Sequence, residues 1–346
     1  MHFSKTDNLS DYFAALDERL DEILPARTSV LAYIAGYTVR LVVPDFEDTR
    51  YVVRDMFARP DNGAAVDATF IWWEDCIDPY RLDQFVHLKN YEQLGRLVFK
   101  ASDDEGYLEI VDDELKGADY RNNKYYLLTY PSSDCQKWPV TVHPFVNHVF
   151  MWAQSHNLLV LHAASVGIDG HGVLIVGHGG AGKSTLACSC LAEGYDFISD
   201  DYCLLSNAGS RIAYPVYTNV FLNPDSLAKL PVLKPFEIQP MQGEKPSFEV
   251  GENRIKPSLP VEAIILPQIT DNAEPELTMD TSNKALAQVI YSTNKQLGYF
   301  YDPVFVRKMA QRLAGMPVYR FSLTKDLHKN CAYFKQWIKE DLPCIN

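Results

Sequence analysis

A glycine-rich stretch in the second half of the chain limits the possible folds and functions more than any other feature. Residues 172–185 read GVLIVGHGGAGKST. Gly177, Gly179 and Gly182 match the dinucleotide fingerprint G-x-G-x-x-G, and residues 177–184 match the P-loop pattern G-x-x-x-x-G-K-[ST]. The apolar run before the glycines predicts a strand, and the residues after Lys183 place apolar side chains on one helical face. The sequence therefore predicts a strand, a phosphate-binding loop and a helix in succession.

Residues beyond the glycines favour the P-loop. In a P-loop, backbone N–H groups surround a phosphate at the positive end of a helix, a lysine meets the β- and γ-phosphate oxygens, and the next hydroxyl binds Mg²⁺. Lys183 and Ser184 stand at these positions. The dinucleotide interpretation has Asp200 in its favour, because an acidic residue about twenty positions after the first glycine binds the ribose. We expect a nucleoside triphosphate, with a dinucleotide as the alternative.

The predicted nucleotide-binding segment includes every residue of the loop and the start of its helix. His178 stands at a variable position of the pattern, so its side chain is expected only to be tolerated there. The full set is Gly177, His178, Gly179, Gly180, Ala181, Gly182, Lys183, Ser184 and Thr185.

Two adjacent aspartates, Asp200 and Asp201, occur in the next expected strand, residues 195–205. Neighbouring residues of a strand point to opposite sides, so the two carboxylates would have different surroundings. Such a pair suits phosphoryl transfer, because one carboxylate can accept the proton of an attacking hydroxyl while the other helps to hold Mg²⁺. Away from a P-loop, the same pair would be expected only to satisfy N–H groups of a turn.

Composition excludes several classes of protein. The chain has 346 residues, of which 47% are hydrophobic, enough for a substantial core. A net charge of -13 argues against a general nucleic-acid-binding protein, which needs a basic surface. The seven cysteines lack any C-x-x-C pair, so neither a zinc knuckle nor a disulfide framework is expected. With no signal-peptide pattern and no apolar run near ~18 residues, we expect a soluble cytoplasmic protein without membrane contact.

The chain is expected to have three parts. Residues 1–27 contain an amphipathic helix with apolar residues three and four positions apart, interpreted as a packing helix. Residues 28–145 carry short apolar and aromatic runs between turn residues, which predicts a β-rich domain for acceptor recognition or packing. Residues 146–346 form the predicted catalytic domain. It begins with a helix and a hairpin over 158–177, and further helices are expected near 282–298, 302–314 and 325–340.

His162, the loop and the aspartate pair together resemble the catalytic core of the HPr serine kinase/phosphorylase family. In that family a histidine-containing strand precedes the P-loop and an Asp-Asp pair follows it. The stretch LHAASVGIDGHGVLIVGHGGAGKSTLACSCLAEGYDFISDDYCLL also resembles shorter HPr-kinase-like proteins of peptide-modifying systems, including lasso-peptide kinases. The close resemblance covers residues 158–205 and weakens towards 266. It implies an α/β fold with a P-loop kinase core of the HPr kinase and phosphoenolpyruvate carboxykinase type, preceded by the β-rich domain.

The resemblance also implies roles for individual residues. Asp200 would be the general base, His162 would support deprotonation near it, and Lys183 would bind phosphate. Ser184 and Asp201 would bind Mg²⁺, so ATP and Mg²⁺ are the expected cofactors. The related kinases make a homo-oligomer a reasonable expectation. The downstream arginine-glycine signature of HPr kinases is not visible here, so the resemblance does not specify HPr as acceptor or a reverse phosphorylase reaction.

Three functions remain open at this point. The first is an ATP-dependent kinase that phosphorylates a hydroxyl of a peptide, a protein serine or a small molecule. The second is a nucleotide-binding regulatory ATPase that needs no acceptor, and the third is a dinucleotide-dependent oxidoreductase. Two basic residues of a polar segment, Lys245 and Arg254, are candidates to reach the triphosphate.

Overall fold

The computed structural model is a mixed α/β structure with two large mixed sheets. It divides into two compact units, Met1–His156 and Asn157–Asn346. The structure describes residues 8–23, 27–44, 55–56, 58–74, 91–93, 98–102, 104–111, 114–129, 143, 145–206, 210–231, 233, 237–238, 247–296 and 303–342.

The first unit is built on a nine-stranded sheet with the order β3-β1-β2-β4-β9-β8-β7-β6-β5. The predicted β-rich character of this region is therefore confirmed for the described residues. Both ends of the sheet are antiparallel, and parallel pairs β2–β4 and β4–β9 join them. The strands are β1 Arg27–Ile34, β2 Tyr37–Pro44, β3 Arg59–Pro60, β4 Ala68–Glu74, β5 Tyr91–Gln93, β6 Val98–Ser102, β7 Gly106–Val111, β8 Glu114–Asp119 and β9 Lys124–Thr129.

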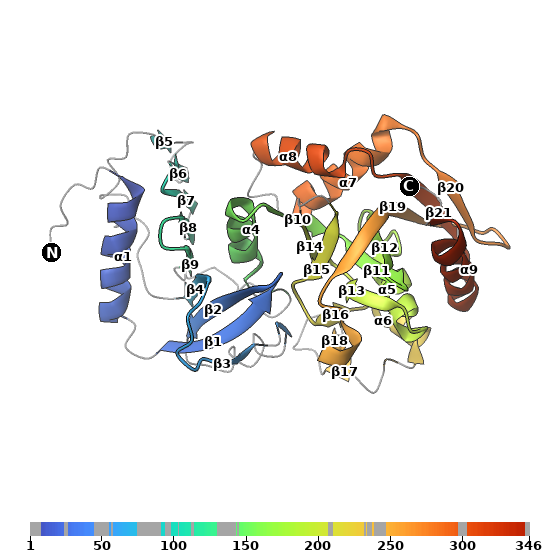
Figure 1. Ribbon diagram of the computed structural model, residues 1–346, viewed down its shortest axis with the longest axis horizontal. Helices are drawn as coiled ribbons and strands as arrows, with labels where there is room; N and C mark the ends of the chain where they lie inside the picture. The colour runs from blue at the N-terminus through green and yellow to red at the C-terminus, as the bar shows by residue number, and fades with distance from the viewer. Residues whose placement is uncertain are drawn as a thin grey trace. The chain divides into compact units, whose positions relative to one another are not determined.

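Helix α1, Leu9–Ile23, packs on this sheet beside β7 and β8 (Figure 1). Phe13 stacks on Tyr126 with ring centroids 5.2 Å apart. A Cβ on Gly117 would lie 2.7 Å from the Phe13 ring, so this glycine makes room for the aromatic side chain. The amphipathic helix is thus a packing helix, as its spacing predicts.

Helix α4, Val146–Ser155, belongs to the first unit, although the sequence placed it at the start of the second domain. Its buried side chains explain the difference. His148 Nε2 lies 2.8 Å from the Ile71 carbonyl, and Trp152 packs edge-on against Phe70. The helix covers strands of the first sheet, and that contact was not visible in the local pattern.

The second unit contains the other nine-stranded sheet. Seven strands follow the order β10-β14-β15-β19-β12-β11-β13, and β21 pairs with both β19 and β20. A small sheet, β16-β18-β17, stands apart. The strands are β10 Leu158–His162, β11 Ala164–Ile168, β12 His171–Ile175, β13 Asp196–Ser199, β14 Tyr202–Ser206, β15 Ile212–Pro215, β16 Asn219–Phe221, β17 Glu237–Ile238, β18 Ser247–Glu249, β19 Leu259–Ile269, β20 Glu276–Met279 and β21 Val318–Leu323.

Four helices of this unit, α5, α7, α8 and α9, agree with the predicted positions to within a few residues, whereas the short helix α6 was not predicted. Helix α5 follows the glycine-rich loop, and α9 packs beside it and buries Phe334 and Trp337 in the same core. Helices α7 and α8 contact each other, and α7 also contacts β10 (Figure 1). The helices are α5 Lys183–Ala192, α6 Pro224–Ala228, α7 Asn283–Gln296, α8 Pro303–Leu313 and α9 Leu327–Glu340, with a 3-10 turn at Glu252–Arg254.

Strands β11 and β12 form the expected hairpin. Its turn residues Asp169 and Gly170 have φ angles of 53° and 87°, the left-handed pair that a two-residue hairpin turn requires. The preceding β10 is a separate strand, which pairs with β14.

The strand expected over residues 195–205 is in fact two strands. β13 ends at Ser199 and pairs with β11, whereas β14 begins at Tyr202 and pairs with β10. Ser199 Oγ stabilises the bend between them, because it donates to the Tyr202 carbonyl and accepts from the Asp201 N–H. Asp200 and Asp201 therefore lie in a bend between strands.

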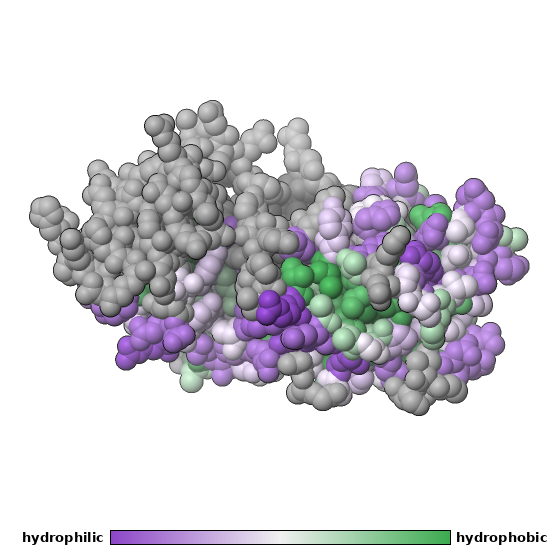
Figure 2. All heavy atoms as spheres, turned by 90° about the horizontal axis from the view of Figure 1, so that it is seen from above, coloured by the Kyte–Doolittle hydropathy of each residue, from purple (hydrophilic) through white to green (hydrophobic). Residues whose placement is uncertain are grey.

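Large hydrophobic side chains are exposed at four described positions. The described part of the face in Figure 2 is mostly hydrophilic, with a hydrophobic area between polar regions. The exposed large hydrophobic side chains among the described residues are Tyr33, Ile269, Met279 and Tyr291. Within the described residues, no helix combines the length and apolar character needed to cross a membrane.

Candidate functional site

The glycine-rich loop connects the end of β12 to the start of α5, and its backbone conformation requires glycine at several positions. Gly180 and Gly182 have φ angles of 84° and 97°, which L side chains rarely adopt. A Cβ on Gly177 would lie 3.0 Å from Ala181 Cβ. At Gly179 and Gly180 an added Cβ would meet nothing within 4 Å, so the outer side of the loop faces open space.

The loop lies where three parallel strands end. Strand β12 pairs in parallel with β19, and β19 pairs in parallel with β21, so their carboxyl ends share one edge of the sheet. A Cβ on Gly182 would lie 3.4 Å from Leu323 and 3.6 Å from Ile269, the last residues of β21 and β19. Ligands of α/β sheets bind at this edge.

Lys183 begins α5 and is 7% exposed. Its Nζ donates a hydrogen bond of 2.9 Å to the Gly177 carbonyl, and Ser292 Oγ of α7 donates one of 3.0 Å to the same oxygen. Ser184 is partly exposed, and the Thr185 Oγ1 lies 2.7 Å from Ser226 Oγ of α6. The first carbonyl of the loop thus holds the lysine amine close to the backbone.

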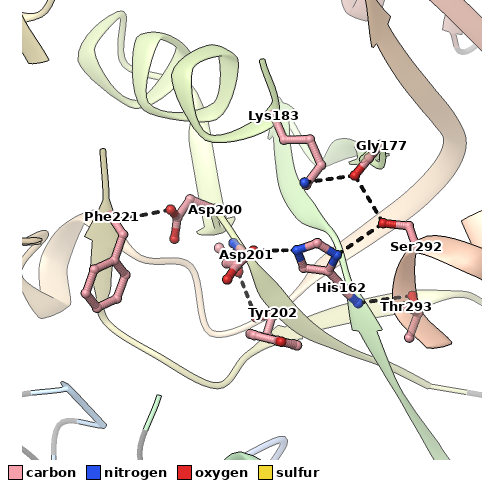
Figure 3. Close-up of polar contacts among 10 residues, drawn as sticks. His162, Gly177, Lys183, Asp200, Asp201, Tyr202, Phe221, Ser292 and Thr293 are labelled. Atoms are coloured by element: carbon pink, nitrogen blue, oxygen red, sulfur yellow. Dashed lines mark hydrogen bonds and ion pairs between the residues drawn. The ribbon is translucent and has the colours of Figure 1, made fainter. Parts of the chain in front are cut away.

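His162, the last residue of β10, lies between an aspartate and a serine (Figure 3). Its Nε2 is 2.8 Å from Asp201 Oδ1, and its Nδ1 is 3.1 Å from Ser292 Oγ. The backbone N–H of His162 donates to Thr293 Oγ1 over 3.2 Å. His162 is 4% exposed, so these polar partners replace water around its ring.

The two aspartates of the bend point in different directions (Figure 3). Asp200 is 2% exposed, and its Oδ2 accepts a 3.1 Å hydrogen bond from the Phe221 N–H of β16. The Asp201 side chain is 27% exposed and faces His162. Asp201, and not Asp200, is therefore the aspartate that His162 holds through its Nε2.

A chain of contacts joins four of the predicted site residues. It runs from Lys183 to the Gly177 carbonyl, then through Ser292 to His162 and on to Asp201. Asp200 occupies the same bend but faces β16. Arg254 ends a 3-10 turn, and Lys245 lies outside the described residues.

Sequence reasoning did not find Ser292 or Thr293. The helix that carries them was expected, but no spacing or motif distinguishes these hydroxyls from others in polar helices. The separation of 115 residues between Ser292 and Gly177 makes their contact a consequence of tertiary structure.

The site offers oxygen ligands. The Ser184 hydroxyl and the carboxylates of the bend are the hard donors that Mg²⁺ prefers, and Mg²⁺ usually keeps several waters. Among the residues described, no group of three or more His, Cys, Asp and Glu is arranged to hold a metal ion. A Mg²⁺ ion bound by one or two carboxylates, waters and substrate phosphates needs no such group.

Four described cysteines are free thiols inside the second unit. Burial raises the pKa of the Cys203 thiol to about 12, so that it stays protonated and unreactive near neutral pH. The other three are Cys188, Cys190 and Cys331. We assign them to the core and not to chemistry.

Comparisons with known proteins gave similarities of two kinds. A family model described as SynChlorMet cassette protein ScmC matches residues 130–223, a segment that contains His162, the glycine-rich loop and both aspartates. A search of curated proteins gave no match. Among solved structures, the Hpr(Ser) kinase/phosphatase from Coxiella burnetii is similar over 52% of this chain and 93% of its own, with 14% sequence identity and a TM-score of 0.29.

Proposed function

We propose that this protein is an ATP-dependent kinase that transfers the γ-phosphate of ATP to a hydroxyl group. One observation carries the proposal: the loop lysine and the His162–Asp201 pair belong to a single network of contacts through the Gly177 carbonyl and Ser292. Phosphate binding and proton transfer need groups of these two kinds close together.

The glycine-rich loop would act as a P-loop. Its backbone N–H groups lie at the positive end of α5, a favourable place for phosphate oxygens. The open space at Gly179 and Gly180 leaves the backbone accessible to a ligand. In this proposal Lys183 turns from the Gly177 carbonyl to the β- and γ-phosphate oxygens when ATP binds.

Mg²⁺ would be held by the Ser184 hydroxyl and the Asp201 carboxylate. When bound, Mg²⁺ neutralises charge on the phosphate oxygens and keeps them in position. Because His162 contacts Asp201, we assign His162 to fixing this carboxylate and not to direct contact with Asp200.

Asp200 is the proposed general base. The acceptor oxygen forms a bond to the γ-phosphorus, the bond from that phosphorus to the bridging oxygen breaks, and the hydroxyl proton goes to the Asp200 carboxylate. The products are the phosphorylated acceptor and ADP. The first unit, residues 1–156, is proposed to contribute to acceptor recognition.

The other two functions have less support. A dinucleotide loop has no use for a lysine and a serine at the start of its helix, and both residues stand there. A regulatory ATPase does not require a general base. Here the buried carboxylate of Asp200 is available for that role, in the same bend as Asp201, the partner of His162.

The test is transfer of label from γ-labelled ATP to the serine-containing peptides, proteins and small molecules of a cell extract. We expect an acceptor to be labelled by the wild-type protein. Lys183→Met, which keeps the carbon stem but removes the charge, should lower labelling by roughly 10² to 10³-fold, as loss of one charge-stabilising donor does in other enzymes. ATP hydrolysis that is equally fast with and without extract, with no labelled product, would favour the regulatory ATPase.

A further inference from the structure

The Gly177 carbonyl accepts two hydrogen bonds, and under the proposed function only one of the two donors stays in place when ATP binds. Lys183 Nζ and Ser292 Oγ both lie within 3.0 Å of this buried oxygen. If Lys183 moves to phosphate, Ser292 is the donor that stays. Ser292 is 6% exposed and belongs to α7, which is separate from the motif formed by β12, the loop and α5.

The hydroxyl of Ser292 has only one proton, so the acceptor of that proton determines the direction of the hydrogen bond between Ser292 and His162. Because the proton goes to the Gly177 carbonyl, Ser292 Oγ must accept from His162, so His162 Nδ1 carries a hydrogen and donates it. Nε2 faces Asp201 and, because a carboxylate oxygen only accepts, donates a second hydrogen bond to it. A single side chain therefore orients both the first carbonyl of the loop and the His162 ring (Figure 3).

We infer that Ser292 is a positioning residue for nucleotide binding, which keeps the Gly177 carbonyl hydrogen-bonded after Lys183 turns to the phosphates. If a buried carbonyl loses every hydrogen-bond donor when a ligand binds, the binding constant falls by roughly ten-fold to a hundred-fold. Without Ser292, binding ATP would impose this penalty, because Lys183 cannot serve the carbonyl and the phosphate at once. The inference rests on the proposed function.

Ser292→Ala and Ser206→Ala provide a matched pair of variants. Ser206 is also a buried serine of the second unit, and its Oγ likewise donates to a carbonyl, that of Ser210, and accepts one N–H, from Ile212. We expect Ser292→Ala to weaken binding of ATP with Mg²⁺ by at least about ten-fold. Ser206→Ala should bind as the wild type does, and Ser292→Thr, which keeps the hydroxyl, should recover most of the lost affinity. Unfolding of the nucleotide-free proteins should show similar losses of stability for the two alanine variants.

A double-mutant cycle with Lys183→Met separates this role from a general loss of structure. In that background no amine leaves the Gly177 carbonyl on binding, so Ser292→Ala should cause little further loss of affinity. Equilibrium dialysis against labelled ATP measures the four dissociation constants. Equal affinity of Ser292→Ala and wild type would overturn the inference, and so would an undiminished ten-fold loss in the Lys183→Met background. Failure of the wild type to bind ATP would instead overturn the proposed function.

Discussion

Two buried histidines, one in each unit, show how differently the same side chain can be surrounded. His148 of the first unit stacks on Phe70 with ring centroids 5.6 Å apart and bonds the Ile71 carbonyl through Nε2. Burial lowers its pKa to about 3, so it is neutral at physiological pH. His162 of the second unit is buried almost as deeply but has Asp201, Ser292 and Thr293 as polar partners.

This comparison teaches that burial alone does not identify a functional histidine. Aromatic neighbours and one backbone carbonyl leave His148 only a packing role. A carboxylate on one ring nitrogen and a hydroxyl on the other give His162 a fixed orientation next to the glycine-rich loop, as its proposed role in fixing Asp201 requires. The following predictions test whether chemistry is confined to the second of these two environments.

The largest effect is expected at Asp200. Asp200→Asn keeps the shape of the side chain but cannot take the hydroxyl proton, so phosphoryl transfer should fall by about 10² to 10⁴-fold with little change in ATP affinity. Asp201→Asn is the matched control and should raise the Mg²⁺ concentration needed for activity. Transfer and ATP binding would be measured for both variants across a Mg²⁺ series. Near-normal transfer by Asp200→Asn would show that another group is the base.

A smaller but more direct contrast comes from replacing each histidine by glutamine. His162→Gln should reduce transfer by roughly 10 to 10²-fold, as loss of the hydrogen-bond partner of a metal ligand does, because Asp201 loses its imidazole. His148→Gln keeps a donor near the Ile71 carbonyl and should leave transfer within about two-fold of wild type, as expected for a position without a chemical role. Phosphoryl transfer by both variants is measured at neutral pH, on protein shown to be folded. Similar losses of activity in the two variants would remove the distinction between the two histidines.

The smallest effect concerns stability in acid and is specific to His148. Its pKa is about 3 in the folded protein, well below the usual value of 6.5, so the unfolded chain binds a proton first as pH falls. Its contribution to stability is complete above pH 6.5 and declines between pH 6.5 and 3, by up to about 1.4 kcal/mol per pH unit. Denaturant unfolding from pH 7 to 5 should be less pH-dependent in His148→Gln than in wild type. Identical slopes would show that His148 is not held neutral by burial.

Local pattern was enough to predict several elements of the second unit. The hairpin β11–β12, the loop with Lys183 and the helices near 283, 303 and 327 all follow from turn residues and helical spacing within short windows. These features depend on neighbours in sequence, so the sequence carries the necessary information. The same holds for α1, whose apolar spacing matches its buried face.

Other features depend on partners far away in sequence. The bend at Asp200 and Asp201 arises because β13 pairs with β11 while β14 pairs with β10, a division that a continuous apolar run does not reveal. Helix α4 has the pattern of any buried helix, and only its packing on Phe70 and Ile71 assigns it to the first unit.

The sequence by itself determined the types of groups in the candidate site: a glycine loop that begins a helix, a lysine, a histidine and two carboxylates. Tertiary structure decided which of them meet. Hydrogen bonds form between groups that the fold brings within about 3 Å, whatever their separation along the chain. For that reason His162 faces Asp201, and Ser292, 115 residues beyond Gly177, completes the contacts of the loop.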